Sequence, residues 1–325
     1  MTSTGAAGPL ILGVDGGGTK TAARIASVSP GGDIVCLGEG SGGPSNMRAV
    51  GPAQAKSNLD AAIDMAHRAA GTGNSEVAVA VLALAAGVLP DVQDEIKSWA
   101  AARKLARHLD IVHDALPLLA LAKRDGRAVG LVVGTGSVAI GVAKSGAEAA
   151  VGGWGYWMSD KGSAWFLGRE ALAAIADAVD GIGASTSLEA AVLEHLSVDE
   201  PRQIVRALTE DGAAQKRIAA MAPLVMSAAA LGDEVAVRIV QAAADAAASL
   251  VKATIDKLQL DKHAPLAMAG GVACSGAYFQ TLLLGSLKAL GVAPETVIVV
   301  SDPVEGSLVM ARDKLPAGTI FPGKA

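Results

Sequence analysis

The sequence is poor in aromatic residues, has only two cysteines and shows no cluster of basic residues. Phe, Trp and Tyr make up 3% of its 325 residues, which argues against the aromatic platforms on which single-stranded nucleic acids stack. Lys and Arg are scattered and the formal net charge is -5, so we expect no nucleic acid partner. Cys36 and Cys274 are too few for a disulfide framework or for an iron–sulfur cluster within one chain.

Export and membrane signals are also missing. The N-terminal segment MTSTGAAGPL has neither the basic region nor the apolar region of a signal peptide. The longest uncharged stretch, residues 263–287, is broken by proline and glycine and is typical of a strand, a turn and a helix. We therefore expect a cytoplasmic protein without a membrane partner.

What the sequence does contain is an alternation of apolar strands and amphipathic helices. A chain of this length favours two domains, and each half opens with a hairpin, which indicates an internal duplication. Strands are expected at 10–14, 33–38, 77–84, 110–113, 129–133, 265–271 with its glycine turn, and 295–302. Helices are expected from about residue 52, from about residue 90, at 165–179, through much of 188–258 with a long helix at 234–258, and at 304–315.

Two tight Gly/Thr turns follow apolar strands. The first is GGGTK at 16–20, after Asp15, and the second is GTGS at 134–137. Glycines let backbone N–H groups turn toward an anion, and Thr and Ser hydroxyls add donors. The pair predicts two hairpins that hold the phosphates of one nucleotide. The alternative is two ordinary hairpins with glycine turns.

Two carboxylates are candidates for chemistry near these turns. Asp15 can support Mg²⁺, with the Lys20 ammonium available for a phosphate oxygen, or it only forms the turn. Asp114 ends a short strand, where open α/β sheets place their chemistry. It can accept a hydroxyl proton during attack on a γ-phosphoryl group, or it caps the following helix. His113 is expected to point to the opposite face of the strand from Asp114.

Two glycine-rich segments are candidates for binding a sugar. Asn46 lies in GSGGPSNM, which we expect to be an irregular loop, and its planar amide can satisfy sugar hydroxyls or simply form a turn. The loop GGWGYWMSDKGS, residues 152–163, combines Gly153, Trp154 and Asp160. In the alternative interpretation Trp154 belongs to the core and Asp160 caps the next helix.

Other nucleotide motifs are weak or missing. The chain has no Gly-x₄-Gly-Lys-Ser/Thr loop. Gly38, Gly40 and Gly43 match the pattern G-x-G-x-x-G, but the acidic residues about 20 positions further on, Asp60 and Asp64, fall within a helical pattern. We therefore do not favour a dinucleotide site.

Together these segments resemble the BadF/BadG/BcrA/BcrD branch of the actin-like sugar kinases, and within it N-acetylglucosamine kinase and bacterial glucosamine kinase. The matching segments follow the family order over nearly the whole chain: GVDGGGTKT, GSGGPSN, the Asp114 segment, VGTGS, GGWGYWMSDKGSAW, AGGV and DPVEGSL. The resemblance implies an α/β fold of the actin-like ATPase type, with two RNase H-like domains around a nucleotide cleft. The expected domains are 1–116 with 304–325, and 117–303.

The resemblance also implies roles for single residues. Asp15 would support Mg²⁺, and Asp114 would be the base that activates the 6-hydroxyl of the sugar. The residues expected to bind ATP are Gly17, Gly18, Thr19, Lys20, Thr135, Gly136, Ser137, Gly270 and Gly271. The residues expected to bind the sugar are Asn46, Asp114, Gly153, Trp154 and Asp160.

The expected substrate is N-acetylglucosamine, with glucosamine as the alternative. Where the N-acetylglucosamine kinases have a Ser-Gly-Gly type turn, this chain has Ala85, Ala86 and Gly87, which removes a hydroxyl that could bond the substrate. Hypotheses from other classes are an ATPase that activates a partner enzyme through a cysteine-held cluster, and a sugar-sensing regulator. The regulator would need a DNA-binding module, for which the segment before Leu10 is too short. We expect a homodimer.

Overall fold

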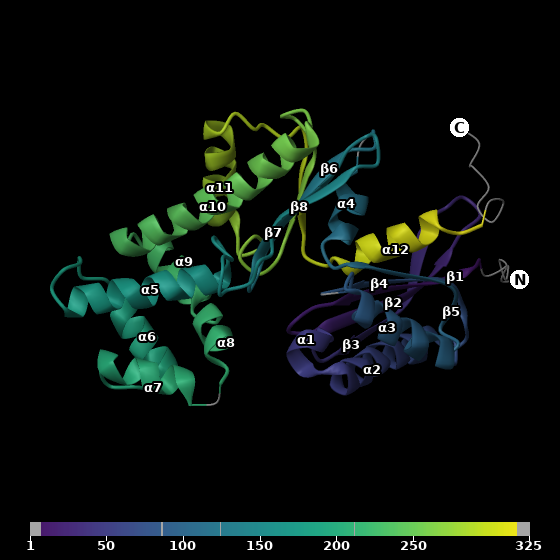
Figure 1. Ribbon diagram of the computed structural model, residues 1–325, viewed down its shortest axis with the longest axis horizontal. Helices are drawn as coiled ribbons and strands as arrows, with labels where there is room; N and C mark the ends of the chain where they lie inside the picture. The colour runs from purple at the N-terminus through teal and green to yellow at the C-terminus, as the bar shows by residue number, and fades with distance from the viewer. Residues whose placement is uncertain (1–7, 86, 124, 211, 317–325) are drawn as a thin grey trace, which may run out of the picture. The chain divides into compact units, whose positions relative to one another are not determined.

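The computed structural model describes residues 8–85, 87–123, 125–210 and 212–316, which form two compact units (Figure 1). Unit 1 runs up to Leu121 and resumes at Asp302, and unit 2 is Ala122–Ser301. Each unit is built around one five-stranded sheet.

The strands are β1 (Leu10–Gly16), β2 (Thr21–Val28), β3 (Ile34–Gly42), β4 (Val77–Leu84), β5 (Ala106–His113), β6 (Ala128–Val133), β7 (Ser137–Val142), β8 (Glu148–Gly152), β9 (Leu266–Ala269) and β10 (Val297–Val300). The helices are α1 (Met47–Val50), α2 (Pro52–Ala70), α3 (Pro90–Ala102), α4 (Leu116–Ala122), α5 (Ala164–Val179), α6 (Leu188–Leu196), α7 (Ile204–Thr209), α8 (Ala214–Ala219), α9 (Ala222–Ala230), α10 (Glu234–Leu258), α11 (Ala277–Ala289) and α12 (Val304–Asp313), with a 3₁₀ turn at Pro201–Gln203.

The two sheets repeat one topology. The strand order is β3-β2-β1-β4-β5 in unit 1 and β8-β7-β6-β9-β10 in unit 2. In each sheet the first three strands of the unit pair antiparallel, and the last two are parallel to the first. The expected internal duplication is therefore present in the fold.

Helices cover both faces of the sheet in unit 1, with α12 on one side and α1, α2 and α3 on the other (Figure 1). The period-2 alternation of β1 explains this arrangement. Leu12 and Val14 belong to the core shared with α2 and α3, whereas Ile11 belongs to the core shared with Leu308 and Ala311 of α12. The C-terminal helix thus completes the fold of the N-terminal sheet.

The glycine-rich segment before Asn46 begins inside a strand, and there the loop expectation was wrong. β3 continues to Gly42, and α2 lies against it. A Cβ atom on Gly40 would be 2.0 Å from the carbonyl oxygen of Ala62, and one on Gly38 would be 2.3 Å from the next turn of the helix. These glycines let a helix backbone approach a strand closely, which accounts for the G-x-G-x-x-G pattern without a dinucleotide.

The acidic residues of α2 also have partners within unit 1. Asp60 and Asp64 both form ion pairs with Arg103, which follows α3. The indole N–H of Trp99 donates to Asp60 Oδ1 at 3.2 Å. These residues join α2 to α3.

In unit 2 the long helix α10 packs on β6, β7 and β8, and α5, α9 and α11 pack on α10. The strand β8 was not expected, because its sequence EAAVG lacks a run of β-branched residues. Across the described residues no single helix is long and apolar enough to span a membrane, although the bent pair 214–230 and 234–258 meets that length and composition when taken together.

Candidate active site

Three parallel strands of unit 1 end beside one another at one edge of the sheet. Gly16 at the end of β1 pairs with Leu84 at the end of β4, and Leu84 pairs with His113 at the end of β5. Asp15 precedes Gly16, and Asp114 directly follows β5. Both carboxylates chosen from the sequence therefore lie at the carboxyl edge, which is where open α/β sheets bind ligands.

The electrostatics of this edge favour a cation. Burial, followed by repulsion from the carboxylates of Asp114 and Asp302, raises the pKa of Asp15 from 3.8 to about 7, against the opposing effect of the Lys20 ammonium. A cation beside these carboxylates would remove the repulsion. Sequence reasoning did not assign Asp302 to the site, although the residue opens the DPVEGSL segment that was singled out.

A bound Mg²⁺ ion would take most of its ligands from phosphate and water and few from the protein. Among the residues that the structure describes, no group of three or more His, Cys, Asp and Glu side chains is arranged to hold a metal ion. Magnesium bound with a nucleotide takes only one or two carboxylates and completes its shell with phosphate and water oxygens. Asp15 fits this limited role.

The first turn is tied to the segment that carries Asn46. The N–H of Gly17 donates to the carbonyl of Lys20 at 3.0 Å, and the N–H of Ser45 donates to the carbonyl of Gly17 at 3.1 Å. The Thr21 hydroxyl donates to the carbonyl of Gly43 at 2.7 Å and lies 2.9 Å from the Ser45 hydroxyl. Two regions singled out separately in the sequence are thus one structural piece.

The tip of the first turn is exposed. Gly18, Thr19 and Lys20 are all exposed, and apart from the two neighbouring residues nothing lies within 4 Å of the place where a Cβ on Gly18 would be. The amide groups and the hydroxyl at the tip therefore border open space, as an anion site requires.

Asn46 is the N-cap of α1 and is half-buried. Its Oδ1 accepts a hydrogen bond from the N–H of Arg48 at 3.0 Å. This bond fixes the plane of the side-chain amide and leaves its NH₂ group as the donor end. The capping role and a substrate role are compatible.

The turn after β4 is joined to β1 through its backbone. The N–H of Ala85 donates to the carbonyl of Gly16 at 2.9 Å, and the N–H of Gly87 donates to the carbonyl of Leu84 at 2.8 Å. Ala86 lies outside the described residues. Position 85, where the related enzymes are expected to have a hydroxyl, is thus next to the first turn.

His113 contacts Asp114, and the expectation that the two side chains diverge was wrong. His113 Nδ1 lies 2.9 Å from Asp114 Oδ1, and this hydrogen bond raises the pKa of His113. The backbone N–H of Ala115 also lies 3.2 Å from His113 Nδ1. When Nδ1 carries a proton it donates to the Asp114 carboxylate, and when it carries none it can accept from the Ala115 N–H. The alternation of a strand fails here because β5 ends at His113.

The second turn is built around Asp160. The carboxylate of Asp160 is buried, and its Oδ1 accepts from the N–H of Ser137 at 3.3 Å. The Ser137 hydroxyl donates to the carbonyl of Lys161 at 2.8 Å, and a Cβ on Gly136 would be 3.0 Å from both carboxylate oxygens of Asp160. Burial raises the pKa of Asp160, and the Ser137 N–H partly offsets this. Asp160 therefore lies beneath the turn, and Ser163 is the residue that caps α5.

The glycine pair after β9 lies at the same turn. Gly270 has φ of +98°, and a Cβ there would be 2.4 Å from the carbonyl oxygen of Val133, the last residue of β6. Gly271 borders open space. The residues expected to bind ATP in unit 2 are thus adjacent, with Thr135 exposed at the tip of the turn.

Trp154 is not a core residue, because 68% of it is exposed. Gly153 and Gly155 on either side have φ of +71° and +79°, which favours glycine and fixes the course of the loop. Further along, the ring of Tyr156 lies 4.9 Å from that of Trp157. The loop presents aromatic surface, as a sugar site requires.

The repeated strand order, with a glycine turn between the first two strands of each sheet, defines the duplicated RNase H-like fold of the actin-like ATPases. Within that class the chain belongs to the BadF/BadG/BcrA/BcrD ATPase family, whose model matches residues 12–311.

Individual relatives and solved structures agree with this placement. The chain is 29% identical over 311 residues to N-acetylmuramic acid/N-acetylglucosamine kinase of Clostridium acetobutylicum, covering 94% of this chain and 98% of the relative. It is 30% identical over 276 residues to N-acetyl-D-glucosamine kinase of Dictyostelium discoideum, covering 81% and 85%.

Among structures, a provisionally assigned N-acetylglucosamine kinase of Chromobacterium violaceum superposes with a TM-score of 0.73 at 23% identity, over 93% of this chain and 99% of that one. A ROK-family glucokinase of Streptomyces griseus in complex with glucose and AMPPNP gives a TM-score of 0.55 at 19% identity, over 94% and 98%. At these identities the structures support the fold.

Proposed function

We propose that this protein is an ATP-dependent kinase that transfers the γ-phosphoryl group to the 6-hydroxyl of N-acetylglucosamine. The observation that carries the proposal is the pair Asp15 and Asp114 at one carboxyl edge, beside a glycine turn with an exposed tip. The curated relatives that match most of the chain are kinases of N-acetylated amino sugars, which supports the choice of acceptor.

Asp114 is the proposed general base. It accepts the proton of the sugar 6-hydroxyl as that oxygen attacks the γ-phosphorus, and the bond from phosphorus to the leaving oxygen of ADP breaks. His113, at 2.9 Å, holds the Asp114 carboxylate in place. Asp15 would hold Mg²⁺, which supplies positive charge to the phosphate oxygens during transfer.

The remaining predicted residues fall into two proposed groups. For ATP we propose residues of both turns together with the glycine pair after β9: Gly17, Gly18, Thr19, Lys20, Thr135, Gly136, Gly270 and Gly271. Among the turn residues, Gly18, Thr19, Lys20 and Thr135 are exposed. For the sugar we propose Asn46, Gly153 and Trp154. Ser137 and Asp160 act by fixing the second turn, since they bond each other.

Glucosamine is the second candidate acceptor, and Ala85 is the observation that favours it. A methyl group at position 85 cannot bond an acetamido group as a hydroxyl would. Replacing Ala85 by Ser is expected to increase the preference for the acetylated sugar if position 85 faces the 2-substituent, and to leave the ratio of kcat/KM values unchanged if it does not.

A panel of sugars tests the proposal. ADP release would be measured with N-acetylglucosamine, glucosamine, N-acetylmuramic acid, N-acetylmannosamine and glucose, and with 6-deoxy-N-acetylglucosamine as the matched control that lacks the acceptor oxygen. We expect the acetylated gluco sugar to give the highest kcat/KM and the 6-deoxy sugar to give none. ATP hydrolysis that no sugar stimulates would overturn the proposal and favour an ATPase that activates a partner.

A further inference from the structure

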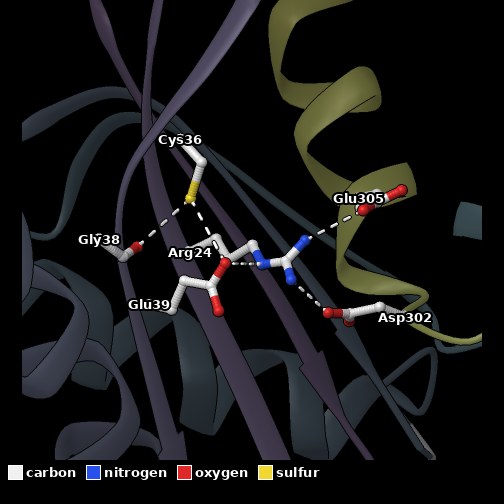
Figure 2. A network of polar contacts seen from close by, with 6 residues as sticks. All are labelled: Arg24, Cys36, Gly38, Glu39, Asp302 and Glu305. Carbon is white, nitrogen blue, oxygen red and sulfur yellow. Dashed lines mark hydrogen bonds and ion pairs between the residues drawn. The ribbon is translucent and has the colours of Figure 1, made fainter.

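Arg24, on β2, forms ion pairs with three carboxylates (Figure 2). Its Nη2 lies 2.5 Å from Asp302 Oδ2, its Nη1 lies 3.3 Å from Glu305 Oε1, and its Nε lies 3.1 Å from Glu39 Oε1 on β3. Asp302 and Glu305 stand at the start of α12, nearly the whole chain length away in sequence. One guanidinium thus fastens the first turn of α12 to two strands of the sheet.

This cluster differs from an ordinary surface ion pair. The Arg24 side chain is only 17% exposed, whereas those of Glu39 and Glu305 are more than 60% exposed. A guanidinium stays charged at every accessible pH and presents several donors in a fixed plane, which suits several carboxylates at once. Exposed single pairs contribute little, whereas a shielded network with one shared cation can fix geometry.

The helix that Arg24 fastens touches the backbone next to both proposed reactive carboxylates. The Ser307 hydroxyl donates to the carbonyl of Val14 at 3.1 Å, one residue before Asp15. A Cβ on Gly306 would lie 2.1 Å from the carbonyl oxygen of Pro117, three residues after Asp114. Glycine and a buried serine at successive positions of α12 therefore let it lie tightly against both segments.

We propose that Arg24 is a positioning residue for phosphoryl transfer: by fastening the first turn of α12 it fixes the spacing between the strands that carry Asp15 and Asp114. This inference rests on the proposed kinase function. Arg24 touches neither carboxylate, so its effect passes through α12. Asp302 adds a second link, because its carboxylate acts electrostatically on Asp15 and is itself held by Arg24.

A shift in the positions of Asp15 and Asp114 is expected to lower kcat more than it weakens the binding of sugar and ATP. Arg24→Gln keeps part of the apolar stem and removes the charge, and we expect kcat to fall about 10- to 100-fold, as for a catalytic group displaced by about 1 Å. The KM values for sugar and ATP and the Kd of ADP, measured by calorimetry, should change less than about threefold because the binding groups remain.

Two variants separate positioning from stability. Arg24→Lys keeps one cation that can reach one carboxylate, so kcat should recover partly. Lys314→Gln removes the ion pair between the other end of α12 and Asp110, and it should lower the melting temperature while leaving kcat within about twofold of wild type. All assays are run well below the measured melting temperatures, on protein with native far-UV circular dichroism.

The outcomes distinguish this inference from the function on which it rests. A wild-type protein without sugar-dependent ADP release overturns the proposed function. An active wild type with kcat unchanged in Arg24→Gln and a lowered melting temperature shows a structural role only and overturns the inference. If Arg24→Gln does not fold, the double variant Arg24→Gln with Asp302→Asn removes the carboxylate charge that would otherwise lose its partner. Arg24→Lys then decides the question: unchanged kcat overturns the inference, and lowered kcat supports it.

Discussion

The two glycine turns occupy equivalent places in two sheets of the same topology, yet they use their polar groups differently. In the first turn the exposed tip carries Thr19 and Lys20, and a carboxylate with a raised pKa stands at its base. In the second turn the N–H and hydroxyl of Ser137 are engaged by Asp160 and the Lys161 carbonyl. The two turns share their place in the sheet, but the first carries an exposed ammonium at its tip and the second encloses a buried carboxylate.

A turn motif alone does not assign a role. The first turn lies at the edge shared with Asp114, and in the proposed function it faces the reacting phosphate and a metal ion. The second turn is braced by Asp160, and in the proposed function it holds the nucleotide in a fixed place. Substitutions at the reactive carboxylates and in the second turn test this division of roles.

Asp114→Asn should have the largest effect on catalysis. The amide cannot take the hydroxyl proton, so we expect kcat to fall by about 10² to 10⁴ with little change in nucleotide affinity. Rapid-quench or coupled assays give kcat, and calorimetry gives the Kd of ADP. Asp110→Asn, on the strand that Asp114 follows, is the control, and near-normal turnover by Asp114→Asn would remove this residue from the mechanism.

Asp15→Asn should lower activity strongly and yet stabilise the metal-free protein at high pH. Because the folded pKa is about 7 and the ordinary value is 3.8, the folded state holds a proton between these values that the unfolded state releases. Stability should therefore decrease as pH rises from about 4 to 7, by at most about 4 kcal/mol, and stay low above pH 7.

Thermal unfolding in EDTA from pH 5 to pH 8.5 measures this effect. The wild type should lose stability across the range relative to Asp15→Asn, and Mg²⁺ with ADP should restore it in the wild type only. Parallel curves for the two proteins would show that Asp15 is not destabilised by burial and by its acidic neighbours.

Substitutions in the second turn should distinguish a residue that contacts ATP from one that stabilises the turn. Thr135→Val removes an exposed hydroxyl and should raise the KM for ATP about 3- to 10-fold without changing the melting temperature. Ser137→Ala removes the bond to the Lys161 carbonyl and should lower stability by about 1 kcal/mol. The reverse pattern, with Ser137→Ala affecting only KM, would mean that the Ser137 hydroxyl leaves its intramolecular bond to bind phosphate.

The smallest effect is expected at His113. Its pKa is raised by the hydrogen bond to Asp114, so the pair stabilises the fold fully below pH 6.5 and loses that contribution as pH rises through the folded pKa. Compared with His113→Gln, the wild type should be more stable at pH 6 and equal at pH 9. A difference that persists at pH 9 would show that packing, not charge, is the source.

Much of the fold followed from local patterns in the sequence. The long helix α10 was expected at residues 234–258 and is found there, because its apolar positions recur with helical spacing. The strands that begin near Leu10 and Val129 were expected because each is a short run of apolar residues followed by a glycine turn. By contrast, the glycines of β3 were misread, since glycine signals a loop locally and close helix contact only in three dimensions. The strand β8 was not expected, because its sequence lacks a run of β-branched residues.

In the candidate site, too, the sequence predicted local features but not contacts between distant segments. Asp15, Asn46 and Asp114 were chosen from the sequence because a carboxylate or amide next to glycines or at a strand end is a local pattern. The contacts of Asp302 with Arg24 and of His113 with Asp114 were not anticipated. The first joins residues 278 positions apart, and the second depends on where a strand stops.

Local sequence patterns set the two glycine turns, the carboxylates beside them and the alternation that builds two similar sheets, because all of these depend on neighbours within a few residues. Tertiary packing sets the different surroundings of the two turns, since Asp160 is buried beneath one turn while Asp114 and Asp302 repel Asp15 at the other. These groups come from segments far apart in the chain. Packing of α12 on β1 brings Asp302 near Asp15, and electrostatic energies depend on distance and burial rather than on sequence order.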